Sequence, residues 1–100
     1  MMVMSMLRIE GDPDDLIERM HGVEEVAARI APEMGGISST MLRTDTGILV
    51  VNLWKDERGR HRMADHPEMR AAMERANLPE PHAEGYEVLK HLTVSEAAPV

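Results

Sequence analysis

Residues 47–73, GILVVNLWKDERGRHRMADHPEMRAAM, decide the fold of this chain. The apolar run of residues 48–54 predicts a strand, which ends in the only tryptophan. The highly charged residues 56–66 predict a helix, and Pro67 opens a second helical piece because proline suits the first helical position. Both faces of the strand are largely apolar, which is typical of a strand that is covered on both sides.

The flanking sequence adds three more strands and one more helix. Residues 3–9 and 37–43 are extended and apolar enough for strands, and residues 44–47 have the chemistry of a hairpin turn. Residues 12–34 predict one helix, because an aspartate and a proline open it and apolar residues recur at spacings of three and four. An alternating pattern over residues 86–94 predicts the last strand.

The order strand, helix, strand, strand, helix, strand predicts an α+β, ferredoxin-like βαββαβ domain. Such a domain is a four-stranded antiparallel sheet with two helices on one face. We expect one domain over residues 1–94 and a flexible C-terminal tail over residues 95–100. The other face of the sheet needs a cover, and a second copy of the chain is the simplest one. The sequence therefore predicts a homodimer through the open face of the sheet, which gives a dimeric α/β barrel.

Composition excludes several classes of function. The formal charge is −7, from 11 basic and 18 acidic residues, so nucleic acid and membrane surfaces are not expected partners. The chain has no cysteine, which excludes disulfides, thiol nucleophiles and thiolate metal sites. No stretch has the apolar length of a membrane span, and the N-terminus does not resemble a signal peptide. We therefore expect a cytoplasmic protein.

The ten methionines allow two interpretations. Methionine is flexible and fills irregular gaps, so these residues can take the place of the missing phenylalanines in the core. The same property suits a soft pocket for a small, flat hydrophobic molecule.

Trp54 and Asn52 are two positions apart on one strand, so they share a face. Trp54 can form a pocket wall whose indole N–H donates a hydrogen bond to a bound molecule, and the Asn52 amide can bind an oxygen of that molecule. The alternative is structural: Trp54 anchors the core and Asn52 satisfies backbone groups at a strand end.

Histidines are the candidate bases, since imidazole titrates near neutral pH. His66 precedes Pro67, where it can act as a base or cap the helix. His61 lies near the same helix break, and its spacing from Asp65 is not convincing for a metal site, so no metal is expected. Tyr86 and Arg43 are strand residues within reach of a pocket.

Two segments carry a family resemblance: LVVNLWKDERGRHRMADHPEMRAAM and the terminal GYEVLKHL. They resemble the dimeric α/β barrel superfamily and, within it, the antibiotic biosynthesis monooxygenase (ABM) group. The resemblance implies oxidation of a flat phenolic or polyketide-type metabolite by O₂ with no cofactor. It implies catalytic roles for Trp54, Asn52 and His66, and substrate contacts from Trp54, Tyr86, Arg43 and His61.

Other functions of the superfamily stay open. They are heme binding, a cyclase or isomerase reaction, and a non-catalytic dimeric ligand-binding domain. Heme-degrading members carry an asparagine on the first strand, where this chain has Ser5 but no asparagine. That difference disfavours heme degradation.

Overall fold

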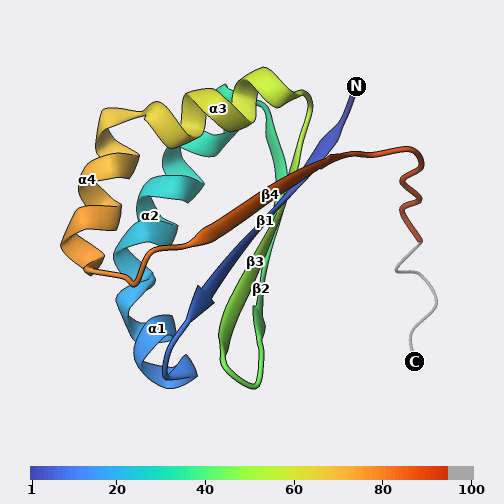
Figure 1. The fold of residues 1–100 in the computed structure, drawn as a ribbon. Coiled ribbons are helices and arrows are strands. Elements are labelled where there is room, and N and C mark those ends of the chain that lie inside the picture. The colour runs from blue at the N-terminus through green and yellow to red at the C-terminus, as the bar shows by residue number, and fades with distance from the viewer. Residues whose placement is uncertain (95–100) are drawn as a thin grey trace.

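Four antiparallel strands form one sheet in the order β2-β3-β1-β4, with the helices on one face (Figure 1). The computed structural model describes residues 1–94, and the predicted tail of residues 95–100 lies outside them. The elements are β1 (Val3–Glu10), α1 (Pro13–Arg19), α2 (His21–Ile30), the 3₁₀ turn η1 (Ala31–Met34), β2 (Gly36–Arg43), β3 (Gly47–Trp54), α3 (Glu57–Asp65), α4 (Pro67–Ala76) and β4 (His82–Glu87). The predicted α+β, ferredoxin-like fold is confirmed.

The two central strands, β1 and β3, hold the sheet side of the core. Their register places Val3 opposite Trp54 and Ile9 opposite Ile48, and all four side chains are buried beneath the helices. Alternate residues along each strand point to the same face of the sheet. The apolar stripes of α1 and α2 complete the core from the other side with Leu16, Met20, Val23, Val26 and Ile30.

The single helix predicted over residues 12–34 is divided in the structure into α1, α2 and η1. The start is as expected, because the Asp12 carboxylate accepts a hydrogen bond from the backbone of Asp15 at 3.3 Å. Pro32 lies within η1, where its missing N–H favours a tighter final turn. Gly35 then ends the helix with a φ of 81°, a left-handed conformation that glycine adopts without strain.

The second helical region breaks at Pro67 as predicted. The Asp56 carboxylate caps α3 by accepting from the backbone of Gly59 at 2.9 Å. His66 Nδ1 caps α4 by accepting from the backbone of Glu68 at 3.1 Å. The first predicted helix is therefore a series of short pieces, α1, α2 and η1, and the second is a bent pair, α3 and α4. All of these pieces cover the same face of the sheet (Figure 1).

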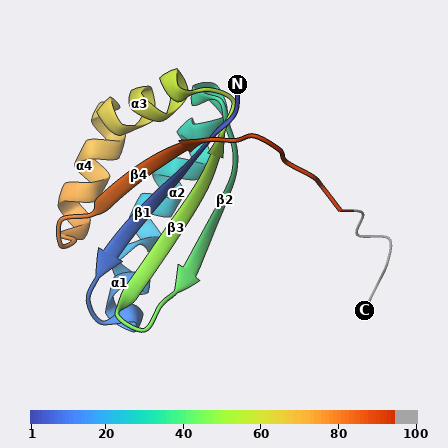
Figure 2. The ribbon, with the colours of Figure 1, turned by 45° about the vertical axis from the view of Figure 1, so that its right-hand side comes forward.

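The last strand lies earlier than predicted. We expected residues 86–94, whereas β4 is His82–Glu87. β4 pairs with β1 alone, and β1 begins at Val3 opposite Glu87, so later residues find no partner strand. Among residues 88–94, the one further backbone hydrogen bond runs from the Val88 N–H to the Met2 carbonyl at 2.9 Å. Residues 88–94 leave the sheet and extend away from the helices (Figures 1 and 2).

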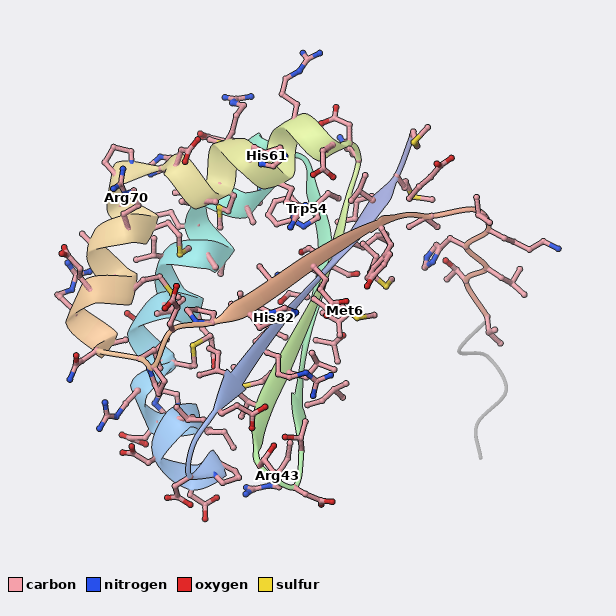
Figure 3. The ribbon with its side chains drawn as sticks, in the orientation of Figure 1. Met6, Arg43, Trp54, His61, Arg70 and His82 are labelled. Atoms are coloured by element: carbon pink, nitrogen blue, oxygen red, sulfur yellow. The ribbon has the colours of Figure 1, made fainter. Side chains whose placement is uncertain are left out.

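The face of the sheet opposite the helices carries a patch of apolar side chains. Figure 2 shows the four strands side by side with α1 and α2 behind them. This open face carries Met4, Met6, Leu42, Leu49, Val51, Leu53 and Tyr86. Met6 points away from the helices in Figure 3. Over residues 1–94, none of the helices has the length and apolarity needed to cross a bilayer.

Candidate active site

A cavity of about 1110 Å³ lies between the helix-covered face of the sheet and helices α2, α3 and α4. Pockets for small molecules usually have about 300–1,000 Å³, so a polycyclic molecule fits in this one. Methionines supply much of its wall, namely Met20, Met41, Met63, Met69 and Met73. Because Met20, Met63 and Met69 are also buried in the core, these residues serve core and cavity together.

Four residues at one level of the sheet form a row across all four strands. The register places Ser39 of β2 opposite Asn52 of β3, Asn52 opposite Ser5 of β1, and Ser5 opposite Gly85 of β4. We call these four residues the polar row. Ser39, Asn52 and Ser5 line the cavity. The polar row therefore sets two hydroxyls and one amide into a wall that is otherwise mostly apolar.

Trp54 is both a core anchor and a cavity wall. Its side chain is 5% exposed, and its indole N–H donates to Ser5 Oγ at 2.9 Å. Figure 3 shows Trp54 beneath α3. A hydroxyl that accepts a hydrogen bond keeps its own proton for another acceptor. Trp54 therefore orients Ser5 and leaves the serine O–H available to Asn52 or to a ligand.

Helix α3 adds two charged side chains to the cavity, Arg60 and His61. Arg60 Nη1 lies 2.7 Å from Glu57 Oε1, and His61 Nε2 lies 2.9 Å from the same oxygen. The alternating charges of this helix are typical of a solvated face, yet the Arg60 side chain is only 23% exposed. Our sequence interpretation missed Arg60, and Gly85 was the available signal, since a glycine within a strand often marks close approach of another group.

Three predicted site residues lie away from this cavity. His66 caps α4 through Nδ1 and does not line the cavity. Arg43 Nη2 donates to Asp14 Oδ1 at 2.7 Å, on the exposed surface at the end of β2. The structure therefore brings Trp54, Asn52 and His61 to one cavity, and it does not bring His66, Arg43 or Tyr86 there.

Tyr86 lies on the open face of the sheet and is 53% exposed. Its hydroxyl donates to the Glu84 carboxylate. That hydrogen bond raises the pKa of Tyr86 and, followed by the one to His82, lowers the pKa of Glu84. Within residues 1–94, no group of three or more histidine and carboxylate side chains is arranged to hold a metal ion.

No family model matches the sequence, and no curated protein matches it. Solved structures do resemble this fold. A proposed antibiotic biosynthesis monooxygenase from Caulobacter crescentus aligns with a TM-score of 0.72 and 14% identity, covering 89% of this chain and 91% of that one. SnoaB, a cofactor-independent oxygenase from Streptomyces nogalater, aligns with a TM-score of 0.63 and 16% identity, covering 91% and 94%.

A dimeric ferredoxin-like protein of unknown function from Jannaschia aligns with a TM-score of 0.70 and 14% identity, covering 88% of this chain and all of that one. Identities this low show a shared fold. The resemblance to ABM-like proteins that the sequence predicted is confirmed at the level of the fold.

Proposed function

We propose that this chain is a cofactor-independent monooxygenase that oxidises a flat, hydrophobic phenolic or polyketide-type molecule in the cavity beneath α3. The observation that carries the proposal is the polar row, which places an amide and hydroxyls in a methionine-lined cavity beside Trp54. An electron-rich enolate can reduce O₂ itself, so a protein needs only to bind it, accept its proton and stabilise its oxygen. The fold shared with SnoaB supports the same class of reaction.

The proposed reaction balances without an external reductant. A CH₂ group of an anthrone-type substrate loses a proton to a base, and the carbanion passes one electron to O₂. The resulting radical pair combines to a peroxide at that carbon, and loss of water leaves a carbonyl. One oxygen atom stays in the quinone and the other leaves as water.

Three residues have proposed roles in that sequence. The amide of Asn52 and the hydroxyl of Ser5 donate to the enolate oxygen, because they face each other in the sheet and both line the cavity. His61 accepts the proton. In the neutral form that keeps its proton on Nε2, which lies 2.9 Å from Glu57 Oε1, the His61 Nδ1 lone pair is free to act as the base.

The test is oxygen uptake with a hydroxyanthrone, with quinone formation followed by absorbance. We expect one O₂ consumed for each quinone formed, at a rate above spontaneous oxidation. Asn52→Leu keeps the side-chain size and removes the amide, so we expect a loss of about 100-fold in rate. Thr40→Val is the matched control, since Thr40 lies opposite Val51 on the open face.

Two results would count against the proposal. Unchanged turnover in Asn52→Leu would remove the role of the polar row. Tight binding of the anthrone with no uptake above the spontaneous rate would favour the alternative of a non-catalytic ligand-binding domain.

We also propose that two copies pair through the open face. Met6 and Val51, which are half-buried, and Leu42, which is exposed, lie there, and burying such apolar area against a partner stabilises association. Light scattering should give twice the chain mass of 11.2 kDa. Val51→Lys should shift the protein to monomer, whereas Glu25→Lys on the exposed side of α2 should not. A monomeric wild type would refute the pairing.

A further inference from the structure

Arg60 reaches from α3 to β4 and rests on Gly85, the end of the polar row. A Cβ at position 85 would collide with Arg60 Nη1 and would lie 2.7 Å from Cζ and 3.2 Å from Nε. Several guanidinium atoms therefore approach the strand together, in space that a Cβ at position 85 would partly fill. The contact places a cation beside the row that holds Ser5 and Asn52.

The charge of Arg60 is available to a ligand. A guanidinium has five N–H donors, and Glu57 takes one of them in a pair of 2.7 Å. The Glu57 side chain is 46% exposed and shares the same oxygen with His61. Because Glu57 engages one donor, a second anion can pair with the N–H groups that remain.

The overall charge makes this local cation matter. A chain with a formal charge of −7 repels anionic small molecules in general. Glu24 and Glu74 also border the cavity, from α2 and α4. An acid that enters beside the polar row needs a specific cation there, and Arg60 is placed to supply it.

We propose that Arg60 binds a carboxylate substituent of the cavity's ligand, so that the site selects flat aromatic acids over their neutral analogues. This inference rests on the proposed function of the same cavity. Guanidinium and carboxylate match as two parallel N–H···O bonds, a geometry that a neutral amide does not reproduce. Gly85 then contributes to specificity, because the absence of a side chain at this position leaves room for the Arg60 guanidinium.

The experiment compares an anthraquinone carboxylic acid with its carboxamide, two quinones that cannot undergo the proposed oxidation. Quenching of Trp54 fluorescence reports binding, since it is the only tryptophan and lines the cavity. Hydrogen bonds to charged groups contribute about 1.5–3 kcal/mol, so we expect the acid to bind about 10-fold tighter or more. The preference should fall as salt is added.

Arg60→Gln should abolish the preference and change the carboxamide affinity by less than about twofold, since only the charge-assisted bonds are lost. Arg58→Gln is the matched control, because Arg58 lies on the same helix and outside this cavity. Gly85→Ala is the second variant. It keeps the arginine but forces the guanidinium to shift from its place on β4, so it should reduce the preference.

Equal affinities of wild type for the acid and the carboxamide would overturn the role of Arg60 and leave the proposed oxygenase intact. A preference that persists in Arg60→Gln would do the same. If neither quinone quenches Trp54, both this inference and the proposed function of the cavity fail.

Discussion

Ser5→Ala tests the link between the buried tryptophan and the polar row. Ser5 is 9% exposed, Trp54 is 5% exposed, and their side-chain hydrogen bond is 2.9 Å long. Alanine removes the acceptor and adds no bulk. The indole N–H then stays buried without its partner, next to a small void where the hydroxyl had been.

The cost follows from desolvation. A buried donor left without an acceptor costs about 1–3 kcal/mol. We expect Ser5→Ala to lower the free energy of unfolding by about 2 kcal/mol, a large fraction of the 5–15 kcal/mol that is typical of small domains. For a domain of this size, that loss corresponds to a fall in Tm of roughly 10 °C.

Urea unfolding followed by Trp54 fluorescence measures the effect at the bond itself. The protein concentration is held constant across variants, because association would add to the apparent stability. Ser39→Ala is the matched control: Ser39 is an exposed serine in the same row, and its change should cost less than about 0.5 kcal/mol. If Ser5→Ala and Ser39→Ala lose the same stability, the indole hydrogen bond does not stabilise the fold and the reasoning is wrong.

Three further predictions test other parts of the structure. Gly22→Ala should stabilise the protein by about 0.5–1 kcal/mol, because nothing lies near the added Cβ. Gly59→Ala should destabilise it, because the added Cβ would collide with a carbonyl of η1. If both variants change the free energy of unfolding in urea in the same direction, the described packing is wrong. The pKa of Glu68 is lowered, first by its hydrogen bond from Arg29 and then by the arginine charge. The Arg29–Glu68 pair should therefore contribute its full stabilisation above pH 4.5, and that contribution should disappear as the pH falls through the lowered pKa of Glu68. The difference in urea midpoint between wild type and Arg29→Gln across a pH series measures this contribution. His66→Ala should lower the free energy of unfolding by about 1 kcal/mol, because it removes a helix cap. His66→Asn should keep both the stability and the oxygen uptake. A large loss of oxygen uptake in a stable His66→Asn variant would instead support a catalytic role for His66.

Local patterns predicted most of the fold. The strand that ends at Trp54, the cap at Asp12 and the break at Pro67 all follow from periodicity and backbone chemistry within a few residues. The last strand could not be predicted this way. Residues 88–94 alternate like a strand, but a strand also needs a neighbour, and β1 begins at Val3, opposite Glu87. The end of the last strand is therefore set by β1, which lies at the other end of the chain.

The candidate site, like the fold, could be predicted from the sequence only in part. Trp54 and Asn52 share a face because they are two residues apart, which the sequence alone shows. The bond from Trp54 to Ser5 joins residues 49 positions apart and depends on the register of two strands. The contact between Arg60 and Gly85 depends further on how a helix packs over the sheet. Gly85 signals a close approach, but neither pairing leaves a local pattern that identifies both partners.

The short strand β4 has a consequence for how the cavity opens. It contains no buried side chain and pairs on one side only, yet its Ala83 forms part of the cavity wall. Native proteins open locally where few apolar contacts hold a segment, at a free energy well below that of global unfolding. β4 is such a segment, whereas β1 and β3 are tied to the core. Excursions of β4 would widen the opening of the cavity while the rest of the sheet stays folded. A ligand that bridges β4 and α3 would make those excursions rarer, so its residence time would depend on how often this edge of the sheet opens.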